Sequence, residues 1–183
     1  MQMAQTTGGW TLEELHRLPD DGNKYELVRG ELFVTPPPSF RHETLASVLE
    51  SILVPYVKSW GLGRIYRPRS VVRLGGSEVE PDLVVRPPTP TLPEKWEDAA
   101  LPILVVEILS DSTRRRDHGP KREWYLDIGI PDYWIVDGEK RTIRRVRPGM
   151  GDVVTGDVLV WHPPGAGEPL VVDIPAFFQE ALG

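Results

Sequence analysis

The clearest pattern of apolar positions along the chain is a helical one. From Ser39, a suitable N-cap, apolar side chains recur at three- and four-residue spacing as far as Trp60. This spacing places them on one face of an amphipathic helix, and Pro55 is expected to kink that helix. The apolar positions are Leu45, Val48, Leu49, Ile52, Leu53, Tyr56, Val57 and Trp60.

The segment before this helix predicts a short helix followed by a β-hairpin. Thr11 and Glu14 have the spacing of a capping box, which favours a helix over residues 11–18. Two strand-like runs, 25–28 and 31–35, then surround an Arg-Gly pair that suits a tight turn. The N-terminal part of the chain is therefore expected to add a helix and a hairpin to the fold.

The segment after the long helix predicts further strands. Residues 64–74 and 78–86 are strand-like, and the Gly-Gly-Ser sequence at 75–77 predicts a turn between them. The nearly continuous apolar run 103–109 is typical of a strand that is buried on both faces.

The C-terminal half combines a helix with short strands. Pro120 suits the first turn of a helix and Gly129 its C-terminal cap, and a strand is expected over 133–136. From Arg141 onward the pattern predicts short strands and turns, closed by a segment around Phe177 and Phe178. We therefore expect an α/β (α+β) fold in which a mixed β-sheet is flanked by helices.

Composition narrows the class of protein. A chain of 183 residues with 40% hydrophobic content favours one domain, spanning 1–183. The absence of cysteine excludes disulfides and thiol nucleophiles and favours a cytoplasmic location. The polar start of the chain lacks the features of a secretory signal, and no apolar run is long enough to span a membrane, so no membrane partner is expected.

The basic residues are clustered, although the net charge is −6. An acidic chain is a poor candidate for coating nucleic acid, because such binding depends on neutralising phosphates. Each basic cluster alone is explained by a solvated surface, whereas several clusters around one site favour phosphate contacts. The clusters are Arg64, Arg67, Arg69 and Arg73; Arg114, Arg115, Arg116, Lys121 and Arg122; and Lys140, Arg141, Arg144, Arg145 and Arg147.

Two acids are candidates for chemistry. Asp82 follows Pro81 and is expected just inside a β-branched strand, although an acid next to proline is also common in turns. Glu107 lies inside the apolar run, where an ionised carboxylate is costly unless it is paired or binds a metal. On neighbouring strands the two carboxylates could share a hard cation such as Mg²⁺, close enough for both to bind it.

Lys121 is the best candidate for a third member of this site. It falls in the first turn of the helix that follows the Glu107 strand, with Tyr125 on the same helical face. An ammonium group there would stabilise the transition state of phosphoryl transfer and help to position a water molecule. The alternative is an ordinary surface lysine.

Several segments together resemble the bacterial Uma family of restriction-endonuclease-like proteins, within the PD-(D/E)XK nuclease superfamily. The resemblance covers most of the chain, and the joint pattern is more specific than any one segment. The segments are Tyr25-Glu26-Leu27-Val28-Arg29-Gly30-Glu31-Leu32, Arg41-His42, Pro81-Asp82, Val106-Glu107-Ile108-Leu109-Ser110, Lys121-Arg122-Glu123-Trp124-Tyr125, Gly129 and Asp132-Tyr133-Trp134-Ile135-Val136-Asp137.

The resemblance implies a restriction-endonuclease-like core and assigns residue roles. Asp82 and Glu107 would be the metal-binding acids, Lys121 the catalytic lysine, and Glu26 an additional acid of the site. The superfamily pattern places a lysine two residues after the second acid, but Leu109 stands there. The simplest explanation is that Lys121, on the adjacent helix, replaces that lysine.

The resulting hypothesis is an endonuclease that cleaves DNA with Mg²⁺, or with Mn²⁺, and acts as a homodimer. Candidate phosphate contacts are Arg114, Arg115, Arg116, Arg122 and His42. The alternative is an inactive nuclease fold that only binds nucleic acid or a partner, because a fold does not dictate a function. DNA versus RNA and sequence preference stay open, and no helical zinc motif or nucleotide-binding motif is present.

Overall fold

A six-stranded mixed sheet forms the centre of the computed structural model, which describes residues 9–110 and 113–183. Its strands run in the order β10-β9-β8-β7-β6-β3. The pair β7 and β8 is parallel and every other pair is antiparallel. The strands are β3 (Arg64–Tyr66), β6 (Leu83–Arg86), β7 (Leu104–Ile108), β8 (Tyr133–Asp137), β9 (Thr142–Val146) and β10 (Val153–Thr155).

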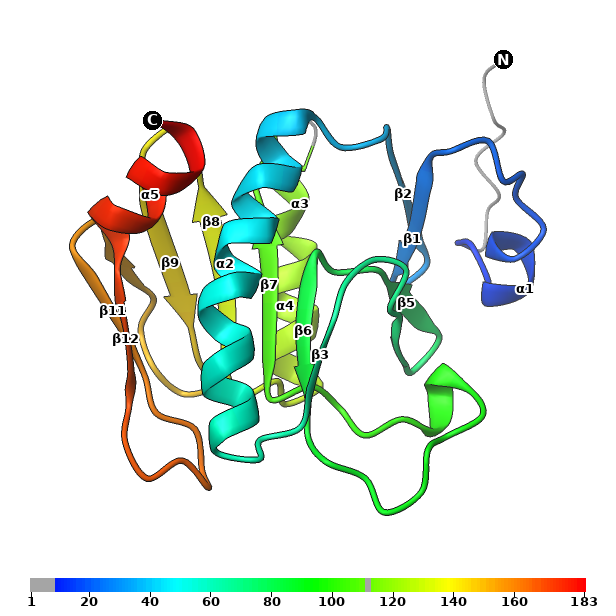
Figure 1. Ribbon diagram of the computed structural model, residues 1–183. Helices are drawn as coiled ribbons and strands as arrows, with labels where there is room; N and C mark the ends of the chain where they lie inside the picture. The colour runs from blue at the N-terminus through cyan, green and yellow to red at the C-terminus, as the bar shows by residue number, and fades with distance from the viewer. Residues whose placement is uncertain (1–8, 111–112) are drawn as a thin grey trace.

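A smaller sheet, in the order β2-β1-β5-β4, lies beside the central one (Figure 1). Its first two strands form the predicted hairpin, with Arg29 and Gly30 both at positive φ (52° and 82°). A two-residue turn of this kind matches the twist of the strands, so the Arg-Gly pair fixes their register. The remaining strands are β1 (Lys24–Val28), β2 (Glu31–Thr35), β4 (Val72–Leu74), β5 (Ser77–Val79), and the separate pair β11 (Val158–Trp161) and β12 (Leu170–Asp173).

Helices cover both faces of the central sheet, with α2 on one side and α4 on the other (Figure 1). The predicted caps are present. Thr11 forms a capping box with Glu14, and the Ser39 hydroxyl accepts a hydrogen bond from the His42 amide at 3.2 Å. The helices are α1 (Leu12–Leu15), α2 (Phe40–Ser59), α3 (Arg114–His118), α4 (Pro120–Asp127) and α5 (Ile174–Leu182), with a 3₁₀ turn η1 (Trp96–Asp98).

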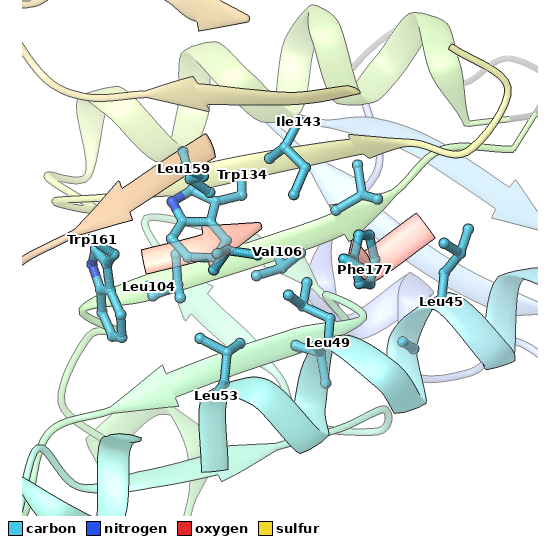
Figure 2. Packing of buried hydrophobic residues seen from close by; sticks show 14 of the residues in the cluster. Leu45, Leu49, Leu53, Leu104, Val106, Trp134, Ile143, Leu159, Trp161 and Phe177 are labelled. Atoms are coloured by element: carbon cyan, nitrogen blue, oxygen red, sulfur yellow. The ribbon is translucent and has the colours of Figure 1, made fainter. Parts of the chain in front are cut away.

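The continuous apolar run of β7 is explained by this two-sided burial. Leu104, Val106 and Ile108 pack with α2 and α5 in the larger core, which is shown in Figure 2. Val105 faces the opposite way, into the core beneath α4. Side chains alternate along a strand, so Glu107 also faces the α4 side. The strand thus delivers one carboxylate into a region enclosed by a second layer.

Two predicted strands were wrong in their extent. Residues 64–74 form β3 and β4, and residues 78–86 form β5 and β6, and in each case the two strands belong to different sheets. The break in the second run falls at Glu80-Pro81-Asp82, where proline lacks the amide needed to continue a ladder. Asp82 therefore immediately precedes β6 and does not lie inside it.

The helix predicted over 11–18 is also shorter, since α1 ends at Leu15. Helix α3 was not anticipated, because its sequence, Arg-Arg-Arg-Asp-His, has no apolar periodicity. The α+β class itself is confirmed. No helix among the described residues combines the length and apolar character needed to cross a membrane. The single-domain and cytoplasmic expectations stay predictions.

The packing of α2 against the sheet predicts a strong contrast between two positions on that helix. Leu49 is fully buried in the larger core, whereas Val54 is 42% exposed. Leu49→Ala should lower the free energy of unfolding by about 2–5 kcal/mol, because it leaves a cavity. Val54→Ala should change it by less than about 0.5 kcal/mol. Urea denaturation of both variants measures the difference, and equal losses would contradict the packing.

Candidate active site

A cavity of about 640 Å³ opens where the two sheets meet the N-terminal end of α2. Its wall combines the start of β1, the loop between β2 and α2, and the ends of the strand regions that carry Asp82 and Glu107. Charged side chains of both signs line it. They are Lys24, Arg41, His42, Glu43, Arg69, Glu80, Asp82, Glu107, Arg114 and Glu139.

Asp82 and Glu107 are brought together by the register of β6 and β7. Leu83 pairs with Val106, and continuing this antiparallel register by one residue sets Asp82 opposite Glu107. The Asp82 Oδ2 atom also accepts a hydrogen bond of 2.7 Å from the amide of Ile108. Both acids line the same cavity. Their carboxylates are thus on one side of the sheet, as a shared cation requires.

The carboxylate of Asp82 lies between the side chains of Lys24 and His42. Its Oδ1 atom lies 3.2 Å from His42 Nε2 and 3.6 Å from Lys24 Nζ. Burial alone would raise the pKa of Asp82, but the Lys24 and His42 charges outweigh it and hold that pKa well below its usual range. Asp82 is therefore an ionised group at the cavity wall.

Glu107 has a different environment, although it lies opposite Asp82. Its Oε1 atom contacts the Lys121 ammonium and accepts a 3.0 Å hydrogen bond from the Tyr125 hydroxyl. Burial raises the pKa of Glu107 to about 7, in spite of the opposing Lys121 charge, and the nearby Asp117 and Asp82 carboxylates add to the rise. The two acids of the site thus differ strongly in their affinity for protons.

Lys121 is completely buried, so it is not a surface lysine. Its Nζ atom contacts Glu107 Oε1 and lies 2.8 Å from Glu26 Oε1 and 3.8 Å from Asp117 Oδ1. Burial would lower the pKa of Lys121, but these carboxylates raise it above its ordinary value. The ammonium contacts Glu107, one of the two expected metal ligands, but Lys121 does not line the cavity.

Glu26 joins the smaller sheet to this cluster. One of its oxygens accepts hydrogen bonds from Lys121 and from the Glu80 amide (2.9 Å), and the other lies 3.2 Å from Arg116. Burial would raise the pKa of Glu26, but the Lys121, Lys24 and Arg116 charges lower it to about 2. Glu26 is fully buried and does not line the cavity.

The predicted phosphate contacts are only partly gathered at the cavity. Arg114 and His42 line it, whereas Arg115, Arg116 and Arg122 do not. Arg116 is buried against Glu26, and Arg122 donates to Asp152 (2.6 Å) elsewhere on the surface. Arg115 is exposed. The guanidinium groups of Arg116 and Arg122 are thus engaged in holding the fold together.

Sequence reasoning missed Lys24. Its ammonium donates to the Glu80 carbonyl at 2.9 Å and lies between the carboxylates of Asp82 and Glu26, at 3.6 and 4.0 Å. The expected strand began at Tyr25, and a lysine outside a strand is ordinarily exposed to solvent. One signal was present. Lys24 and Glu26 are two residues apart, so their side chains share one face of β1.

The donors fit a hard divalent cation. Two carboxylates face one cavity, and Mg²⁺ is commonly bound by one or two carboxylates together with water and phosphate oxygens. Within residues 9–110 and 113–183, no group of three or more histidine, cysteine, aspartate or glutamate side chains could hold a metal alone. Asp82 and Glu107 would thus share the cation with non-protein oxygens.

Comparisons with known proteins identify a family and a similar fold. The family model Uma2, described as "Putative restriction endonuclease", matches residues 12–169. A crystal structure described as "a putative nuclease belonging to DUF820", from Anabaena variabilis, is similar with a TM-score of 0.77. It is 23% identical, over 94% of this chain and 99% of that chain, a likeness that shows the fold. No curated protein matches the chain.

The enclosure of Lys121 predicts a large effect on stability. Lys121→Met leaves the Glu26 and Glu107 carboxylates buried without their main counter-charge. Loss of one partner from such a buried group should lower the free energy of unfolding by about 3–5 kcal/mol. Lys140→Met, at an exposed lysine, is the control. A loss below about 1 kcal/mol in urea denaturation would contradict the described contacts.

The pKa of Glu26 predicts a pH-dependent contribution to stability. It is lowered from an ordinary value of 4.5 to about 2 in the folded chain. The ionised carboxylate therefore stabilises the fold fully above pH 4.5, and this contribution is lost as the pH falls toward 2. Glu26→Gln should be much less stable than the parent near pH 7 and closer to it near pH 3. Urea denaturation at both pH values measures the free energy of unfolding of the two proteins. A difference between them that does not change with pH would contradict the lowered pKa of Glu26.

Proposed function

Because the chain belongs to the Uma2 family, we propose that it is a metal-dependent endonuclease that hydrolyses DNA phosphodiester bonds. The observation that carries the proposal is the pairing of Asp82 and Glu107 in one cavity wall. The family and the fold support a nuclease. Metal dependence and DNA as the substrate are the proposed refinements.

In this proposal Asp82 and Glu107 hold Mg²⁺, with Mn²⁺ as a substitute. The bound ion would polarise the phosphate and lower the pKa of a water molecule. The protein orients both acids in advance. The Ile108 amide and His42 fix the Asp82 carboxylate, while Tyr125 and Lys121 fix Glu107. Such second contacts decide how firmly a carboxylate is directed at its ligand.

Other groups at the cavity suit a phosphate backbone. Arg41, Arg69 and Arg114 line it, and the N-terminal end of α2 lies at its edge. Arginine side chains and helix N-termini both favour negatively charged oxygens. The lining acids Glu43, Glu80 and Glu139 limit this positive charge. The proposed binding is therefore local to the cavity and does not extend over the whole surface.

A second candidate function is binding of nucleic acid without cleavage. It is favoured by Leu109, which lies in the cavity wall at the position where the superfamily pattern has a lysine. An apolar side chain there contributes no charge to a phosphate. Cleavage then depends on lysines supplied by other elements.

The two functions are separated by a DNA cleavage assay. Supercoiled and single-stranded DNA are incubated with the protein and Mg²⁺, Mn²⁺ or EDTA. We expect cleavage that requires a metal ion and that falls by at least about 100-fold in Asp82→Ala and Glu107→Gln, since each removes a group that organises the transition state.

Glu180→Gln is the matched control for this assay, because Glu180 is an exposed acid on α5 outside the cavity. It should cleave DNA like the parent chain. Cleavage that persists in Asp82→Ala would indicate a contaminating nuclease. Retarded migration of DNA on a gel without cleavage by the parent chain would leave only the binding function.

A further inference from the structure

The cavity presents a lysine that the family resemblance did not assign. Of the described residues that line the cavity, Lys24 is the single lysine. Its side chain is 19% exposed, whereas that of Lys121 is 0% exposed. Of these two lysines, Lys24 is therefore the one that a phosphate in the cavity can reach.

We propose that Lys24 is the substrate-binding lysine of this site and that Lys121 is a positioning residue acting through Glu107 and Glu26. The ligand of Lys24 is a phosphodiester group of the nucleic-acid backbone. The inference rests on the proposed function, because it names the group that holds the substrate beside the two acids.

The contacts of Lys121 oppose a direct role in substrate binding. Its ammonium contacts Glu107 and Glu26 and lies near Asp117. Turning it toward a phosphate would leave buried carboxylates without compensation, which is strongly unfavourable. Lys121 therefore stays in contact with Glu107 and acts by fixing the position and charge of that carboxylate.

The contacts of Lys24 leave it able to bind. Its short hydrogen bond goes to the Glu80 carbonyl at 2.9 Å, while Asp82 and Glu26 lie at 3.6 and 4.0 Å. An ammonium group has three N–H donors, so a phosphate oxygen can be bound without breaking the bond to Glu80. The bond to Glu80 then anchors the ammonium at the cavity wall.

The position of Lys24 should favour phosphate binding but oppose metal binding. The ammonium lies 3.6 Å from Asp82 Oδ1 and repels any cation bound to that carboxylate. Its removal should weaken binding of the phosphate backbone while leaving metal affinity unchanged or higher. A lysine that served only to hold Asp82 in place would weaken both when removed.

The test compares Lys24→Met and Lys24→Arg with Lys58→Met, which removes an exposed lysine at the far end of α2. Binding of a fluorescent DNA duplex is measured by anisotropy in EDTA, between about 50 and 200 mM salt. Lys24→Met should bind about tenfold more weakly, and its plot of log affinity against log salt should be shallower by about 0.9, the value for one lost phosphate contact. Lys24→Arg should recover most of the affinity, and Lys58→Met should match the parent.

Calorimetric titration with Mn²⁺ alone supplies the second measurement. Retained or tighter Mn²⁺ binding by Lys24→Met supports the substrate role, whereas weaker binding would overturn it. DNA binding by Lys24→Met as tight as that by Lys58→Met would also overturn the substrate role of Lys24. If the parent chain still cleaves DNA in that case, the proposed function stands. A parent chain that neither binds nor cleaves DNA would overturn both.

Discussion

The contact of one buried ammonium with two buried carboxylates is the interaction on which the rest of this structure depends. Lys121 of α4 meets Glu26 of β1 and Glu107 of β7, so a strand from the N-terminal part of the chain converges with β7 and α4 on one charge. Burial of any of these groups alone would be strongly unfavourable, and their mutual compensation makes the arrangement tolerable. The smaller sheet is thereby fixed against the central one, and the cavity between them acquires a defined shape.

Asp82 and Glu107 have different electrostatic roles, because their surroundings differ. Asp82 stays ionised because Lys24 and His42 face it, whereas deep burial makes Glu107 retain a proton more readily. The divergence comes from the surroundings of the carboxylates, since register places the residues side by side. A cation entering the cavity would thus be attracted first by Asp82, and would favour the ionised form of Glu107 once bound.

Local patterns in the sequence predicted those features that depend on nearby residues. The hairpin followed from the Arg-Gly turn, α2 from its apolar spacing, and the pairing of Asp82 with Glu107 from their places beside or within apolar strands. The role of Arg116 did not follow, because its partner Glu26 is far away in the sequence. Lys24 was missed because Asp82 and Glu80, which hold it at the cavity, are also far from it in the sequence. The division of residues 78–86 between two sheets also depends on tertiary pairing, and only Pro81 hinted at it.

The break at Glu80-Pro81-Asp82 affects which parts of the cavity wall can accept substitutions. The chain leaves the smaller sheet at β5 and enters the central sheet at β6, and Asp82 stands at the crossing. One side of the cavity is formed at the edge of the central sheet, and the other by a hairpin and a proline-rich loop. Substitutions in the proline-rich loop can reshape the entrance without altering a contact of the acid pair, whereas Lys24 and Glu26 tie the hairpin to that pair. The loop is thus the part of the cavity wall whose sequence the acid pair constrains least.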